Sequence, residues 1–275
     1  MVSEGSSAFT EMESMNTAKK YEYSIEGENG YPISCMEWPR EAAEAVLVCL
    51  HGFAGDKYST VIQAVAERLL QESVRVITFD WPGHGASPAE GDALSVENCL
   101  SDLDCVLRHI RSTNPDLPLY LFATSFGAFL GLNYIAEHPD VFSKVILRSP
   151  ALRMPETVLS FLTPEERQIL ENGETLNMGF DRPLWLGKAF HENLNSHSLT
   201  GFHFPEGVPG LIIQGDLDDV VNPEDSCAFA RKHHLQLHIV RGADHRYKNE
   251  GDLEEILSVT AAFLKREGEG EKSAF

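Results

Sequence analysis

Short apolar segments alternate with longer segments of helical periodicity along most of this chain. Six such apolar segments end at turn residues, and they cover residues 45–50, 74–79, 119–124, 145–149, 210–215 and 235–241. Short apolar runs that are bounded by turns and separated by helices are typical of parallel strands. The alternation therefore predicts an α/β fold, in which helices cover both faces of a mostly parallel central sheet.

Local signals support this interpretation at the N-terminal side of the chain. Ser95 is a suitable N-cap, and the leucines that follow it recur at helical spacing, which predicts a helix with one face in the core. Residues 21–25 and 33–38 are separated by the turn-rich stretch E-G-E-N-G-Y-P. These two runs predict an antiparallel hairpin at one edge of the sheet.

One region breaks the alternation. Residues 152–205 have no good strand signal but contain helix-like pieces, one of them capped by Thr163. With 275 residues, the chain fits one large domain with an insertion. We therefore expect an α/β core of residues 19–151 and 206–267 and a helical cap, or lid, of residues 152–205. Residues 1–18 are polar, small and acidic and predict a flexible leader, and the C-terminal R-E-G-E-G-E-K-S-A-F has the same character.

The predicted cap is rich in aromatic side chains. Six of them are Phe161, Phe180, Trp185, Phe190, Phe202 and Phe204. Such residues either line the mouth of a substrate pocket or hold the cap together by packing, and the sequence leaves both interpretations open. Phe161, Trp185 and Phe190 are the candidate substrate-binding residues.

Charge and cysteine content exclude several classes of partner. A formal net charge of -20 opposes binding to nucleic acid and to anionic lipid surfaces. No segment approaches the roughly 20 apolar residues of a membrane span, and the N-terminus lacks the features of a signal peptide. The five cysteines include no C-x-x-C pair, as is typical of reduced thiols. We expect a cytoplasmic protein that has no membrane span, and its oligomeric state stays open.

The apolar run 119–124 ends in A-T-S-F-G and leads directly into a helical stretch. A strand, a sharp turn and a helix are the context of a nucleophile elbow, in which Ser125 would expose its hydroxyl above the sheet. Small residues two positions before and after the serine let strand and helix approach. Gly127 meets this requirement, whereas Ala123 stands where such motifs have glycine. The alternative, that Ser125 is a simple helix N-cap, remains open.

A second turn, H-G-F, follows the apolar run 45–50. A tetrahedral oxyanion needs two fixed N–H donors, and the backbone amides of Phe53 and Phe126 are the predicted pair. His51 is expected to brace this turn. In the third strand-end loop, F-D-W-P-G-H-G-A-S, Asp80 and His84 are expected to serve as scaffold.

Together these motifs resemble the α/β-hydrolase superfamily. The resemblance is carried by H-G-F, D-W-P-G-H-G-A-S, A-T-S-F-G, G-D-L-D-D-V-V and G-A-D-H, in this order, and covers about residues 20–266. Within the superfamily the chain is similar to serine-aminopeptidase-like and monoglyceride-lipase-like lipases and esterases, including bacterial cinnamoyl (feruloyl) esterases. The resemblance implies the α/β-hydrolase fold with its cap, and a Ser, Asp, His order of catalytic residues.

The resemblance also selects the base and the acid. His245 in G-A-D-H follows the final strand, where superfamily members place the catalytic histidine. In related enzymes the acid lies three residues after the glycine that ends the preceding strand, which selects Asp218. Asp216 and Asp219 are then expected to shape the turn, although spacing alone leaves them as alternatives.

These residues predict a serine carboxylic ester hydrolase that acts on neutral, apolar or aromatic acyl esters through a covalent acyl-enzyme. The expected partner is a small-molecule ester. This mechanism needs no metal and no organic cofactor. The paired His233 and His234, with His238, could suggest a metal site, but a solvated face is the better interpretation, because there is no H-E-x-x-H motif and no clustered Cys/His set. A thioesterase, an amidase or peptidase, or a carbon–carbon hydrolase would use the same triad. A catalytically silent hydrolase-fold binding protein is the alternative from another class.

Overall fold

The computed structural model describes residues 20–69 and 72–265, and the predicted leader of residues 1–18 lies outside these ranges. Its main sheet has eight strands in the order β1-β2-β4-β3-β5-β6-β9-β10. The bounds of these strands are β1 Tyr21–Glu26, β2 Pro32–Trp38, β3 Ala45–Leu50, β4 Val74–Phe79, β5 Leu119–Thr124, β6 Lys144–Arg148, β9 Gly210–Gly215 and β10 Gln236–Val240. Neighbours from β4 to β10 all pair in parallel, so the predicted mostly parallel α/β sheet is confirmed.

The N-terminal edge of the sheet is antiparallel. Strands β1 and β2 form the predicted hairpin, with Tyr21 opposite Glu37, and β2 continues the sheet by pairing antiparallel with β4. The described part of the chain contains no helix long and apolar enough to cross a bilayer.

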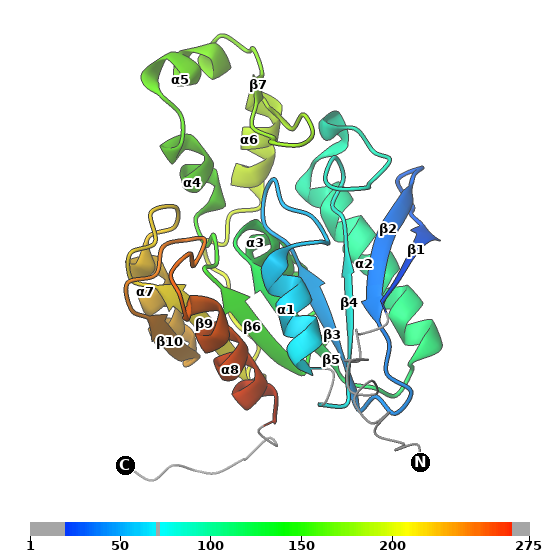
Figure 1. The fold of residues 1–275 in the computed structure, drawn as a ribbon. Coiled ribbons are helices and arrows are strands. Elements are labelled where there is room, and N and C mark those ends of the chain that lie inside the picture. The colour runs from blue at the N-terminus through cyan, green and yellow to red at the C-terminus, as the bar shows by residue number, and fades with distance from the viewer. Residues whose placement is uncertain (1–19, 70–71, 266–275) are drawn as a thin grey trace, which may run out of the picture.

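Helices cover both faces of the sheet (Figure 1). One face carries α2 (Val96–Thr113), α3 (Phe126–Glu137) and α7 (Pro223–His233), and the other carries α1 (Thr60–Arg68) and α8 (Asp252–Lys265). Strand β3 shows why the strands are apolar throughout. Val46, Val48 and Leu50 point into the core under α2 and α3, whereas Leu47 and Cys49 point into the core under α1 and α8.

The chain between β6 and β9 leaves the sheet and extends beyond the carboxyl ends of its strands (Figure 1). It forms α4 (Met154–Ser160), α5 (Pro164–Glu171), β7 (Leu176–Asn177), β8 (Trp185–Leu186) and α6 (Lys188–Ser196). Strands β7 and β8 pair antiparallel over two residues each, which is too short to leave a periodic signal in the sequence. We propose that residues 152–205 act as a cap, and we call them the cap segment.

Two polar side chains tie the cap segment to the core. Arg182 donates hydrogen bonds to the backbone carbonyls of Gly85, Ser87 and Ala89. Asn193 of α6 accepts from the backbone N–H of Val96 at 2.8 Å and so supplies a partner to the first turn of α2. Buried helix ends need such partners, so α6 and the chain before it are held at a defined place over the sheet.

Helix α3 begins in very close contact with the end of β3. A Cβ at Gly127 would lie 2.6 Å from the carbonyl oxygen of His51 and 2.7 Å from that of Leu50, closer than real Cβ atoms approach. Both neighbours are backbone atoms and cannot rotate away. Glycine at this position therefore allows the helix after Ser125 to pack directly on the β3 turn.

We expect the substitution Gly127→Ala to lower the free energy of unfolding by roughly 1–3 kcal/mol, because the added methyl group overlaps fixed backbone. Gly131→Ala on the same helix is the matched control, since its Cβ would meet only the side chains of Leu121 and Leu50 within 3.4 Å. Chemical denaturation of both variants checks this. Equal stability of the two would show that the close approach is not tight.

Candidate active site

Ser125 occupies the turn between β5 and α3 with φ 52° and ψ -113°, a conformation that costs a non-glycine residue of order 1–3 kcal/mol. Backbone hydrogen bonds hold it there. Its N–H donates to the carbonyl of Arg148 at 3.0 Å, and its carbonyl accepts from Ala128, Phe129 and Ala151. The strained turn presents the serine side chain at the carboxyl edge of the sheet, as the elbow motif predicts.

The three residues predicted as nucleophile, base and acid lie together. His245 Nε2 is 3.1 Å from Ser125 Oγ, and His245 Nδ1 is 2.9 and 3.0 Å from the two carboxylate oxygens of Asp218. They follow β5, β10 and β9, whose carboxyl ends meet at one edge of the sheet. Because the carboxylate can only accept, Nδ1 carries the proton and Nε2 is free to accept the serine proton.

Asp218 is the buried member of the three neighbouring aspartates. Its carboxylate accepts from the N–H groups of Val220 and Val221 and from the side-chain amide of Gln214. Burial alone would raise its pKa, but the hydrogen bond and charge of His245 and the two backbone donors outweigh burial and lower the pKa. Asp218 therefore stays ionised. Asp216 instead binds the N–H of Gly242 at the surface, and Asp219 is exposed.

The predicted oxyanion donors, the amides of Phe53 and Phe126, flank the serine. In the described residues no backbone carbonyl accepts from either amide, and Phe126 is the first residue of α3, where N–H groups point out of the helix. The turn that carries Phe53 lies against the nucleophile, since a Cβ at Gly52 would be 3.4 Å from Ser125 Cβ.

Two buried histidines hold this turn. His51 Nε2 accepts from the N–H of Trp81 at 3.2 Å, and His84 Nε2 accepts from the N–H of Ala54 at 3.1 Å. In both rings Nδ1 lies 2.9 Å from a carbonyl oxygen and donates to it. Burial lowers the pKa of His51 to about 4 and that of His84 to about 3, so both stay neutral and keep one accepting nitrogen.

Asp80 joins the same two loops through a buried ion pair. Its carboxylate lies 2.8 Å from Lys57 Nζ and also accepts from the N–H groups of Lys57 and Ala86. A Cβ at Gly85, where φ is +48°, would overlap that carboxylate. This contact explains the second glycine in the P-G-H-G-A-S motif. His51, Asp80 and His84 thus serve as scaffold.

The six cap aromatics do not behave alike. Only Phe190 stacks on Phe53, at a ring distance of 6.3 Å, and Phe53 in turn packs edge-on against Phe126. Phe161, Phe180 and Trp185 are 48, 77 and 46% exposed. Phe202 instead stacks on Phe229 of α7, and Phe204 lies against Gly210 at the start of β9. The packing interpretation therefore holds for these last two.

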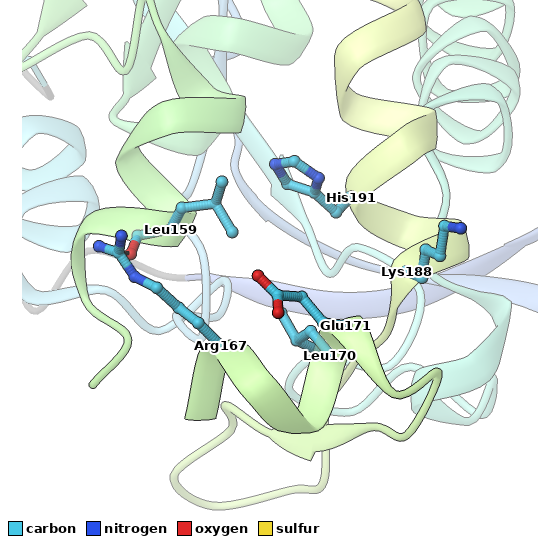
Figure 2. A pocket seen from close by; sticks show the side chains of 6 residues that line it. All are labelled: Leu159, Arg167, Leu170, Glu171, Lys188 and His191. Carbon is cyan, nitrogen blue, oxygen red and sulfur yellow. Dashed lines mark hydrogen bonds between the residues drawn. The ribbon is translucent and has the colours of Figure 1, made fainter. Parts of the chain in front are cut away.

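A pocket of about 420 Å³ lies within the cap segment, between α4, α5 and α6 (Figure 2). It is lined by two leucines and four polar side chains: Leu159, Leu170, Arg167, Glu171, Lys188 and His191. Glu171 and His191 extend into the space between α5 and α6 (Figure 2). None of the six aromatics is among these lining residues, so this pocket is more polar than the aromatic chamber expected from the sequence.

Sequence reasoning missed two residues that hold the loop of His245, namely Arg148 and Tyr247. Arg148, the last residue of β6, donates from Nη2 to the carbonyl of His245 at 3.1 Å, and its guanidinium lies over the ring of Tyr247. Tyr247 is buried, and its hydroxyl lies within hydrogen-bonding distance of Ser149 and Ile213. The available signal was an arginine directly after the apolar run of residues 145–147.

Comparisons with known proteins agree with this geometry. The family model described as serine aminopeptidase, S33, matches residues 41–177. Human monoglyceride lipase is 30% identical over 138 residues, which cover 48% of this chain and 44% of that protein. The monkeypox virus monoglyceride lipase homolog is 30% identical over 127 residues, or 45% of this chain and 44% of that protein. The chain thus matches less than half the length of these relatives.

Among solved structures, ferulic acid-bound Est1E from Butyrivibrio proteoclasticus is similar with a TM-score of 0.77. The two are 22% identical, and the likeness covers 88% of this chain and 97% of that one. At this identity the likeness shows the fold alone. The family match includes Ser125 but ends before Asp218 and His245, so the assignment of acid and base depends on the hydrogen-bond geometry.

The two scaffold histidines predict a pH dependence of stability. Their pKa values are about 4 and 3 in the folded protein, against an ordinary value of 6.5, so between these limits the unfolded chain binds more protons. The stability that these two neutral histidines contribute is therefore complete above pH 6.5. It is lost as the pH falls toward 4, by on the order of 3 kcal/mol for each histidine. We expect His84→Gln to flatten this dependence in denaturation measured at a series of pH values. An unchanged slope would contradict the role of His84.

Proposed function

Because the chain belongs to the α/β-hydrolase superfamily, among its serine hydrolases, we propose that it hydrolyses carboxylic esters through a covalent acyl-enzyme. One observation carries the proposal: the continuous hydrogen-bond chain from Ser125 through His245 to the buried Asp218. An ionised acid, a histidine in the tautomer that accepts at Nε2, and a serine on a strained turn are what nucleophilic catalysis requires.

The reaction follows from these positions. His245 Nε2 takes the proton of Ser125 as Oγ bonds to the acyl carbon, and the amides of Phe53 and Phe126 stabilise the oxyanion. When the intermediate collapses, the bond to the leaving oxygen breaks and His245 gives that oxygen its proton. Water then attacks the acyl carbon and loses a proton to His245. When this second intermediate collapses, the bond from the acyl carbon to Ser125 Oγ breaks, and His245 returns the proton to Oγ as the acid leaves. Asp218 stabilises the imidazolium in both halves.

We further propose that the preferred substrates are neutral esters with aromatic or short-to-medium acyl groups. The cluster of Phe53, Phe126 and Phe190 offers an apolar surface beside the proposed oxyanion donors. A net charge of -20 disfavours the encounter with anionic esters. Hydroxycinnamate esters and monoacylglycerols belong in the first screen, because the similar proteins are a structure with bound ferulic acid and monoglyceride lipases.

A screen separates this proposal from enzymes that use the same triad. It compares p-nitrophenyl esters of increasing chain length, monoacylglycerols, methyl hydroxycinnamates, amides and acyl thioesters. Neutral esters are expected to give the highest kcat/KM. If polyanionic acyl thioesters were turned over much faster than every neutral ester, the protein would be a thioesterase instead.

We expect Ser125→Ala to abolish ester hydrolysis, with a loss of several orders of magnitude in kcat, because no other group supplies the nucleophile. The variant should fold as well as the wild type, since the hydroxyl contributes little to packing. Initial rates with p-nitrophenyl acetate and the thermal unfolding midpoint test both points. Fluorophosphonate labelling of wild type but not of the variant excludes a catalytically silent protein. Substantial turnover by pure Ser125→Ala would refute the assignment.

The cap aromatics predict a graded effect on substrate binding. Phe190→Ala removes the ring that stacks on Phe53 and should raise KM for aromatic esters between about two- and tenfold, with little change in kcat. Phe161→Ala and Trp185→Ala remove rings that are about half exposed and should change KM less. Steady-state kinetics on a methyl hydroxycinnamate and on p-nitrophenyl acetate provide the comparison. A KM unchanged from the wild type in all three variants would show that the cap aromatics do not contact the substrate.

A further inference from the structure

Arg148 contacts the backbone of both reacting residues. Its own carbonyl accepts from the N–H of Ser125 at 3.0 Å, and its Nη2 donates to the carbonyl of His245 at 3.1 Å. The residue ends β6, which lies in the sheet between the strands that lead to Ser125 and to Asp218. One residue of the core therefore joins the turn of the nucleophile to the loop of the base.

The Arg148 side chain also packs against the loop that follows β10 and carries His245. The guanidinium carbon lies 4.2 Å from the ring centre of Tyr247, two residues after His245. Tyr247 has a φ of +54°, and its hydroxyl is 3.1 Å from Ser149 Oγ and 3.3 Å from the carbonyl of Ile213. The loop is thus held in a strained conformation by contacts that converge on Arg148 and Tyr247.

This arrangement is costly for the folded protein. Arg148 is only 6% exposed, and within the described residues its Nε has no hydrogen-bond partner. Burial lowers the pKa of the guanidinium, although Tyr247, Asp218 and Asp244 oppose that effect. A buried cation with an unsatisfied N–H usually stabilises a protein less than an apolar side chain of the same size. Packing alone therefore does not explain an arginine here.

The charges around the triad suggest what the cation does. Asp218, after β9, faces both Arg148 and His245, and Asp244 and Tyr247 face Arg148 from the loop that carries the base. Asp244 also pairs with Lys248 Nζ at 3.0 Å. Carboxylates on the loops of both the acid and the base therefore attract the guanidinium, which helps to hold it against the carbonyl of His245.

We propose that Arg148 is a positioning residue that holds His245 at hydrogen-bonding distance from Ser125. The proposal rests on the ester hydrolase function proposed above. Arg148 touches no reacting atom, and it acts through the carbonyl of His245, the ring of Tyr247 and the carboxylates beside them.

The test compares Arg148→Met with Arg148→Lys, and Arg75→Met is the matched control. Arg75 is a partly buried strand arginine, paired with Glu37 near the opposite end of the sheet. For Arg148→Met we expect kcat for p-nitrophenyl acetate to fall roughly 10- to 100-fold with little change in KM. The melting temperature should stay at or above that of the wild type.

Arg148→Lys keeps a charged donor for the carbonyl of His245 and should recover most of kcat, whereas Arg75→Met should leave kcat unchanged. An unchanged kcat in folded Arg148→Met, or a low melting temperature with full activity per folded molecule, would overturn the proposal. If Arg148→Met does not fold, Arg148→Gln takes its place. Failure of both to fold would assign the residue a purely structural role. Absence of fluorophosphonate labelling in the wild type would instead overturn the ester hydrolase function.

Discussion

The strained backbone at Ser125 is the constraint on which the rest of the site depends. A residue with φ 52° and ψ -113° persists only where its surroundings leave no alternative. Here the restraints come from the neighbouring strand β6 and the residues that follow it. The N–H of Ser125 donates to the carbonyl of Arg148, and the carbonyl of Ser125 accepts from the N–H of Ala151. Gly127 lets α3 begin against β3. Because these restraints are backbone contacts at the ends of neighbouring parallel strands, the sheet holds the turn in its strained conformation.

A second layer of the site consists of buried polar groups that bind other parts of the protein backbone rather than the three residues of the proposed triad. The Lys57–Asp80 pair and the rings of His51 and His84 join the loop after β3 to the loop after β4. Each is neutral or paired, so the cost of burial is offset by satisfied hydrogen bonds. Their effect is to fix the turn of Phe53 beside the nucleophile, since backbone donors act on an oxyanion only if they do not have to reorganise.

The cap segment is attached to the core at a few points, and its aromatic side chains pack in different places. Arg182 and Asn193 attach α6 and the chain before it to core backbone, and Phe190 then stacks on Phe53. Away from that attachment the pocket is lined by two leucines and four polar side chains rather than by the aromatics that composition suggested (Figure 2). Aromatic residues in an insertion pack wherever an apolar surface is near, and for Phe202 that surface is α7. Their number in the sequence therefore carries little information about the substrate.

The sequence by itself determined the parallel α/β sheet, the hairpin at its edge and Ser125 as the candidate nucleophile, because buried strands and tight turns restrict residue type locally. The candidates His245 and Asp218 came from the resemblance to known hydrolases, since no local rule separates Asp218 from Asp216 and Asp219, and the sequence assigned Arg148 no distinguishing role. Those assignments depend on which carboxylate is buried against His245 and which strand end lies beneath it. Such contacts join residues up to 120 positions apart, so only the tertiary structure decided them.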